Sequence, residues 1–94
     1  MIVRFHIDLM EQDQYEYRVS YEGEDLYSDA GLESIEACIV AATEGLGQDA
    51  IAAEVAYKGI ISGTYALASL ALVSAQIAEH ALQTTAAIEE VLEG

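Results

Sequence analysis

The side chains in this sequence that could do chemistry are mainly carboxylates, and they are densest between residues 22 and 36. The chain has 17 Asp and Glu against 3 Lys and Arg, which gives a formal net charge of −14. Carboxylates in a row on a rigid scaffold can imitate a phosphate backbone and occupy a basic, nucleic-acid-binding channel. Acidity of this kind also serves solubility, or adaptation to high salt. The candidate partner-binding residues are Glu22, Glu24, Asp25, Asp29, Glu33 and Glu36.

The remaining reactive side chains form no catalytic or metal-binding pattern. His6 and His80 are the only histidines, and neither has a Cys or His at the spacing of metal ligands. Cys38 falls on the apolar side of a predicted helix, so we expect it to be buried and not to act as a nucleophile. The serines lack a nucleophile-elbow sequence. We therefore expect a protein that is not an enzyme and needs no cofactor or metal.

One short segment has the spelling of a dinucleotide-binding loop. Residues 45–50 read Gly-Leu-Gly-Gln-Asp-Ala, which matches G-x-G-x-x-A. That loop requires a strand before it and a crossover unit around it. A helix is predicted before it here, and Gly45 followed by Leu46 fits a helix end in the left-handed conformation. We interpret the segment as a helix stop.

Two alternating runs near the start of the chain predict a β-hairpin. Between residues 3 and 9, and again between 15 and 21, every second residue is apolar or aromatic. The predicted register pairs Leu9 with Tyr15, Ile7 with Tyr17 and Phe5 with Val19 on the core side. His6 then lies opposite Arg18 on the outer face. A third short strand over residues 25–28 completes a meander within residues 1–28.

An amphipathic helix is predicted over residues 29–46. At 100° per residue, Leu32, Ile35, Cys38, Ile39, Ala42 and Leu46 form its apolar side. Another arc carries Glu33, Glu36 and Glu44, with Val40 among them. One side of this helix is thus expected to pack and another to present carboxylates to solvent.

Residues 48–93 are predicted to be helical, with a break near 59–63. An unbroken helix would be roughly 65 Å long, too long for a compact domain of this size. Gly59 and Gly63 are the places where helix is least favourable. The segment 59–78 carries no charged side chain, so we expect the last helix to be long, Ala-rich and largely buried. An alternative interpretation makes part of it an oligomer interface, formed by Leu70, Val73, Ile77 and Ala81.

These elements predict one α+β domain over residues 1–94, with a two- or three-stranded antiparallel meander followed by about three helices. Segment 59–78 is long enough to span a membrane, but its serines, glutamine and alanines dilute the apolar content, and we expect no spanning helix. The lone cysteine and the absence of a signal-peptide pattern in the opening residues lead us to expect a cytoplasmic protein.

The charge excludes direct nucleic-acid binding and favours a basic protein as partner. The leading hypothesis is a small acidic inhibitor that blocks a nucleic-acid-binding complex, as phage inhibitors of restriction or CRISPR complexes do. One alternative is a homo-oligomeric structural or adaptor domain, with a homodimer as its simplest form. Another is an antitoxin or immunity protein that neutralises a cationic toxin.

Overall fold

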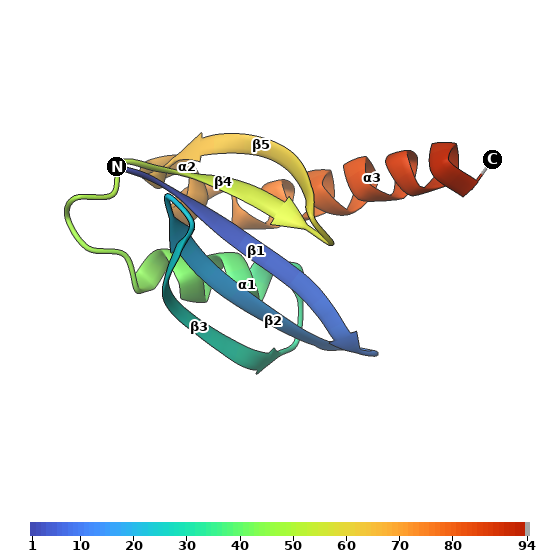
Figure 1. Ribbon diagram of the computed structural model, residues 1–94, viewed down its shortest axis with the longest axis horizontal. Coiled ribbons are helices and arrows are strands. Elements are labelled where there is room, and N and C mark those ends of the chain that lie inside the picture. The colour runs from blue at the N-terminus through green and yellow to red at the C-terminus, as the bar shows by residue number, and fades with distance from the viewer. Residues whose placement is uncertain (94) are drawn as a thin grey trace.

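The computed structural model describes residues 1–93, which fold into one five-stranded sheet with three helices on one of its faces (Figure 1). The strand order is β3-β2-β1-β4-β5, in which β1 and β4 are parallel and the other neighbours are antiparallel. The fold is therefore α+β, as predicted. The elements are β1 (Ile2–Glu11), β2 (Gln14–Tyr21), β3 (Glu24–Leu32), α1 (Ile35–Glu44), β4 (Ala52–Tyr57), β5 (Ile60–Ala66), α2 (Leu67–Leu72) and α3 (Ser74–Glu93).

The N-terminal hairpin has the predicted register. Leu9 faces Tyr15, Ile7 faces Tyr17, Phe5 faces Val19, and His6 faces Arg18. The alternation of apolar and polar residues determines this register, because a shift by one residue would turn the apolar side chains to solvent. The prediction of the hairpin is confirmed.

The third strand is present but longer than predicted, and this corrects the start of the first helix. Residues Glu24–Leu32 are extended and pair with β2, so the chain is not helical from residue 29. Helix α1 begins only at Ile35, where the Ser34 hydroxyl accepts a hydrogen bond from the amide of Ala37 at 3.0 Å. A serine at this position stabilises the helix start, and it marks the boundary better than Ser28 or Asp29.

Residues 52–66, predicted as part of a broken helix, form the antiparallel pair β4–β5. Lys58 and Gly59 are the two residues between the strands, with φ values of 52° and 78°. Two consecutive positive φ values define a type I′ turn, which fits the twist of a hairpin and is helped by glycine. The chain does turn beside Gly59, but between two strands. A bulge lies beyond it, where the Ser62 hydroxyl donates to the carbonyl oxygen of Val55 at 3.3 Å.

The expected left-handed end of α1 is also wrong. Gly45 does end the helix, but its φ is −82°, so the backbone there is right-handed. A Cβ at this position would lie only 2.8 Å from the ring of Tyr27. A larger residue here would have to push the Tyr27 ring aside, which favours glycine at this helix end.

The core lies between the sheet and the helices. Its largest fully buried side chains include Phe5 and Ile7 of β1, Ile39 of α1 and Leu70 of α2. Thr85 of α3 is also buried, and its hydroxyl donates to the carbonyl oxygen of Tyr57 in β4 at 3.3 Å. The opposite face of the sheet has no helix over it (Figure 1).

Helix α3 is long, as predicted, but it is largely exposed. Its buried positions are Ser74, Ile77, Ala78, Ala81 and Thr85, all in its first twelve residues. The rest of the helix extends beyond the β4–β5 turn (Figure 1). The expectation of a largely buried helix is wrong because most of the uncharged segment 59–78 lies in β5 and α2. Only its last five residues belong to α3. Within residues 1–93, no helix has both the length and the apolar content to cross a membrane.

Candidate functional site

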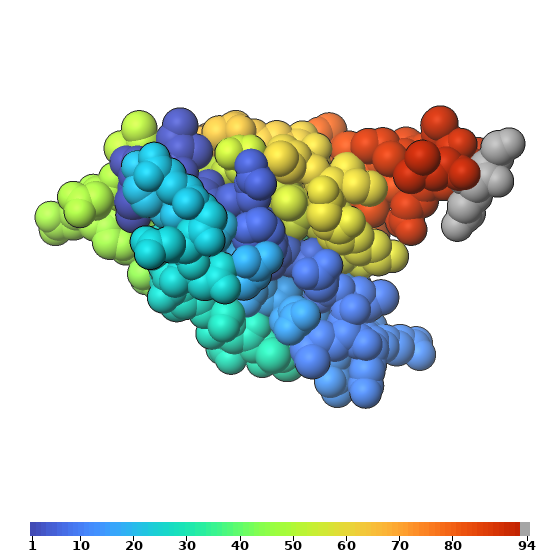
Figure 2. All heavy atoms as spheres, in the orientation of Figure 1, coloured from blue at the N-terminus to red at the C-terminus, as the bar shows by residue number. Residues whose placement is uncertain are grey.

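The six predicted partner-binding carboxylates are all exposed, but they do not form one row. Glu22 lies in the β2–β3 turn, Glu24, Asp25 and Asp29 lie on β3, Glu33 precedes α1, and Glu36 lies in its first turn. Strand β3 is an edge of the sheet, and its residues, together with the turn before it, form part of the outer surface in Figure 2. The β2–β3 turn, strand β3 and the start of α1 therefore share these carboxylates.

The sheet register divides the strand carboxylates between its two faces. Asp25 pairs with Ser20 and points to the open face, where its carboxylate accepts a hydrogen bond from Arg18 at 2.7 Å. Asp29 pairs with Tyr17, whose side chain is in the core, so Asp29 belongs to the helix-covered side. Asp25 is thus already paired with a cation, whereas Asp29 lies near α1.

Helix α1 and the two residues before it bring the other carboxylates around a shallow groove with a mixed polar and apolar lining. The groove has a volume of about 390 Å³ and is open to solvent. Val40, 38% exposed, lies in it with Ala37 and Ala41, and three glutamates line the same groove. We call it the acidic groove, and its residues are Glu33, Ser34, Glu36, Ala37, Val40, Ala41 and Glu44. An apolar strip lined by carboxylates fits a long basic side chain, whose alkyl stem is apolar and whose head is charged.

Tyr27 holds β3 against α1 and so fixes the two acidic elements relative to each other. Its hydroxyl donates to the carbonyl oxygen of Ala42 at 2.5 Å. Its ring meets that of Tyr17 edge to face, with centroids 6.3 Å apart. Burial, and to a lesser extent the neighbouring Tyr17, raise the pKa of Tyr27 to about 12. The hydroxyl therefore stays protonated, and able to donate, well beyond neutral pH.

The residues predicted as an alternative oligomer interface lie mostly inside the chain. Leu70, Ile77 and Ala81 are buried in the core, and only Val73 is exposed. A second copy could not reach the three buried residues without opening the core. The exposed apolar side chains of this region are instead those of Leu72, Val73, Leu82, Ile88, Val91 and Leu92.

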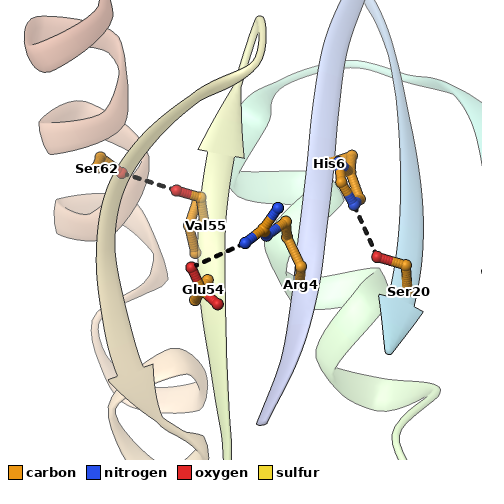
Figure 3. Close-up of polar contacts among 6 residues, drawn as sticks. All are labelled: Arg4, His6, Ser20, Glu54, Val55 and Ser62. Atoms are coloured by element: carbon orange, nitrogen blue, oxygen red, sulfur yellow. Dashed lines mark hydrogen bonds and ion pairs between the residues drawn. The ribbon is translucent and has the colours of Figure 1, made fainter. Parts of the chain in front are cut away.

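A second candidate site lies on the open face of the sheet. Arg4 and Arg18, two of the chain's three Lys and Arg residues, line a hollow of about 220 Å³. Figure 3 shows Arg4 reaching from β1 toward Glu54 of β4, with the Arg4 Nη2 and Glu54 Oε2 atoms 3.4 Å apart. We call this site the arginine hollow, and its residues are Ile2, Arg4, His6, Arg18, Ser20, Glu22, Gly23 and Glu54.

His6 and Ser20 form a direct pair on the wall of the arginine hollow. His6 Nε2 lies 2.8 Å from Ser20 Oγ across the β1–β2 pair (Figure 3). Partial burial, followed by the positive charges of Arg18 and Arg4, lowers the pKa of His6 below its ordinary value. A neutral imidazole beside a hydroxyl can take part in acyl transfer when a third group orients the ring. Within residues 1–93 no hydrogen bond to the other ring nitrogen is found, so this pair lacks such a group.

Of the remaining reactive side chains, Cys38 lies in the core, as the sequence predicted. Burial, with a smaller contribution from Asp29, raises the pKa of its thiol to about 11. His80 is exposed on α3, where its Nε2 lies 3.5 Å from the hydroxyl of Thr84. In the described part of the chain, no three His, Cys, Asp or Glu side chains are grouped so that they could hold a metal ion.

Sequence reasoning identified parts of both sites. It placed Glu33, Glu36 and Glu44 on one arc of a helix with Val40, and it placed His6 opposite Arg18. It did not identify the arginine hollow. The hairpin alternation already put Arg4 and Ser20 on the same face, but Glu54 comes from a strand that was predicted to be a helix.

Comparisons with models of protein families, with curated proteins and with solved structures find no significant match to this chain. Its function must therefore be argued from the geometry.

Proposed function

We propose that this chain is a small, non-catalytic interaction protein that binds a basic protein surface through the acidic groove and the adjoining β3 edge. The observation that carries the proposal is the acidic groove itself. It combines exposed Val40 with three glutamates, and no Lys or Arg lines it. Because no cationic side chain in the groove neutralises them, these carboxylates present their full negative potential to a partner.

The geometry supports a partner whose arginine or lysine side chains enter the groove. The alkyl stem of such a side chain would cover Val40 and Ala37, and its charged head would reach Glu33, Glu36 or Glu44. Contacts between opposite charges at an interface speed association and lose strength as salt is added. We expect the same of this complex.

The preferred class of partner is a nucleic-acid-binding complex, because its basic channel is built to hold a row of negative charges. On this proposal, the chain occupies the channel and excludes the nucleic acid. A cationic toxin would offer similar electrostatics, as for an antitoxin or immunity protein. Competition separates the two classes, since DNA or RNA displaces the chain only from a partner that itself binds nucleic acid.

The test compares two double variants with equal change of charge. Glu33→Gln/Glu36→Gln neutralises two carboxylates of the groove, and Glu79→Gln/Glu90→Gln neutralises two exposed carboxylates on α3. Each protein is immobilised, exposed to a nuclease-treated bacterial lysate, washed at low and high salt, and then challenged with DNA or RNA. Proteins retained by the wild type and the α3 variant, but lost from the groove variant, support the proposal. Equal loss from both variants would mean that only total charge matters, and the groove would be rejected.

A second candidate function is a homo-oligomeric domain, favoured by the uncharged exposed surface of α2 and the start of α3. Leu72 is 83% exposed and Val73 is 36% exposed in a segment without charge. Replacing Leu72 by Lys would then reduce the mass measured by light scattering to that of one chain. An unchanged mass in wild type and variant, equal to one chain, would exclude this function.

A further inference from the structure

We propose that the arginine hollow binds an oxyanion, a phosphoryl or carboxylate group, between the guanidinium groups of Arg4 and Arg18. This goes beyond the proposed function, because the hollow lies on the open face of the sheet and the acidic groove lies on α1. Two of three Lys and Arg residues share one hollow in a chain with 17 acidic residues. Its volume of about 220 Å³ is several times the roughly 30 Å³ that one water occupies in the liquid. A phosphate-sized group therefore fits.

The register of β1 and β2 places the two arginines where one ligand can reach both. Arg4 pairs with Ser20 and His6 pairs with Arg18, so Arg4 and Arg18 are diagonal neighbours on the same face. Diagonal positions in an antiparallel pair are roughly 7–8 Å apart. In the structure Arg4 turns toward Glu54 of β4 and Arg18 turns toward β3, so a ligand between them has to draw both guanidinium groups inward. Arginine side chains are long enough to converge over such a distance, and their planar donor arrays match the oxygens of carboxylates and phosphates.

Both guanidinium groups have donors to spare. Arg4 gives one contact of 3.4 Å to Glu54, and Arg18 gives one hydrogen bond of 2.7 Å to Asp25. Their side chains are 45% and 48% exposed. Each guanidinium has five N–H donors, and exposed single ion pairs of this kind contribute at most about 1 kcal/mol. An incoming oxyanion can therefore recruit both arginines without breaking a strong internal contact.

Ser20 can supply a third donor. If His6 carries its proton on Nε2, it donates to Ser20 Oγ over the observed 2.8 Å. The hydroxyl proton of Ser20 is then free to point into the hollow. The His6–Ser20 pair thus has a use in ligand binding that requires no catalysis.

Three carboxylates oppose the ligand. Glu22 and Glu54 line the same hollow. Glu54 competes directly for Arg4, and Asp25 competes in the same way for Arg18. Repulsion from them lowers the affinity for any oxyanion. The opposition also gives the proposal a distinctive signature, because removing the Glu54 charge should tighten binding, whereas removing either arginine should weaken it.

The test is a nuclear magnetic resonance titration of the whole chain with sodium phosphate and, separately, sodium acetate, with chloride used to hold the ionic strength constant. We expect saturable shifts of the His6 ring and of the amides of Ser20 and Gly23 with at least one of the two anions. Saturation by phosphate alone identifies a phosphoryl site, and saturation by acetate alone identifies a carboxylate site. Absence of saturable shifts with both anions overturns the proposal.

Substitutions of single charged residues test whether the anion binds in the arginine hollow. Arg18→Gln and Arg4→Gln should each weaken it about tenfold, equivalent to about 1.4 kcal/mol, and Glu54→Gln should strengthen it. Lys58→Gln removes the third cation, on the remote β4–β5 turn, and should change nothing. The two arginines are tested singly because each variant retains the other internal ion pair, and its amide spectrum reports whether it is folded. Equal affinity in both arginine variants and wild type would also overturn the proposal.

Discussion

Replacing Tyr27 by Phe removes one hydroxyl and keeps the ring, so it isolates the hydrogen bond that holds β3 against α1. The hydroxyl donates to the carbonyl oxygen of Ala42, and the ring contact with Tyr17 does not depend on it. A hydrogen bond of this kind contributes about 1 kcal/mol, and leaving the partner carbonyl unsatisfied can add to the loss. We expect Tyr27→Phe to lower the free energy of unfolding by about 1–2 kcal/mol. Each kcal/mol corresponds to a fall in Tm of roughly 4–8 °C for a domain of this size.

Alkaline pH should reduce the difference between the two proteins. The pKa of Tyr27 is raised from 10.0 to about 12 in the folded chain. Above pH 10 the unfolded chain therefore binds fewer protons than the folded chain, and stability falls as pH rises toward 12. The full shift corresponds to about 2.7 kcal/mol, which solvent screening of this partly buried group reduces to about 1–2 kcal/mol. The variant lacks this hydroxyl and so lacks this part of the alkaline loss.

The assay is urea unfolding followed by circular dichroism, at neutral pH and at several pH values between 10 and 12. Wild type should exceed Tyr27→Phe in stability at neutral pH, and the gap should close as Tyr27 ionises in the unfolded chain. Tyr21→Phe is the control, because the Tyr21 hydroxyl makes no hydrogen bond within residues 1–93. A gap between wild type and Tyr27→Phe that stays constant across the alkaline range would refute the reasoning.

Three further predictions concern the core and the helix boundaries. Leu70→Ala should lower the free energy of unfolding, measured in urea, by about 2–5 kcal/mol, because Leu70 is fully buried. Leu72→Ala should change it little, because Leu72 is 83% exposed. Equal losses in the two variants would contradict the placement of α2. Ser34→Ala should lower the free energy of unfolding by about 1 kcal/mol, since it removes the acceptor for the Ala37 amide. Ser34→Asp, measured in the same urea unfolding assay, should retain most of the stability. Cys38, buried and with its pKa raised to about 11, should react with a thiol reagent at neutral pH only at the rate of unfolding, and rapid labelling of the folded chain would show that α1 does not cover it.

The N-terminal hairpin could be predicted because its two strands carry the alternation that one buried face requires. Phe5 and Ile7 point to the core, while Arg4 and His6, which alternate with them, lie on the open face. This local pattern determines both the strand and its register. It does not indicate what lies on the other side of β1, where the neighbour is β4, a strand distant in sequence.

The β4–β5 pair was missed because alanine occupies positions on both of its faces. Ala53 is in the core and Ala52 is on the open face, so polar and apolar residues do not alternate clearly. Alanine also has the highest intrinsic helix propensity, which tertiary pairing overrides here. The available signal was Lys58-Gly59 between Tyr57 and Ile60, because a glycine in a two-residue connection between β-favouring residues is typical of a hairpin.

The sequence reveals the acidic groove better than the arginine hollow. The reason is the long-range pairing of β1 with β4. The acidic groove comes from one helix, so the 3.6-residue periodicity was enough to place Glu33 and Glu36 beside Val40. The arginine hollow needs three strands, and Glu54 joins Arg4 only because β4 runs parallel to β1. A parallel pairing requires a crossover, and α1 lies within that connection, on the face opposite the hollow. The crossover that brings Glu54 to Arg4 therefore also places the acidic groove on the other side of the sheet. On the two proposals, the basic partner and the oxyanion would occupy opposite faces and would not compete for the same surface.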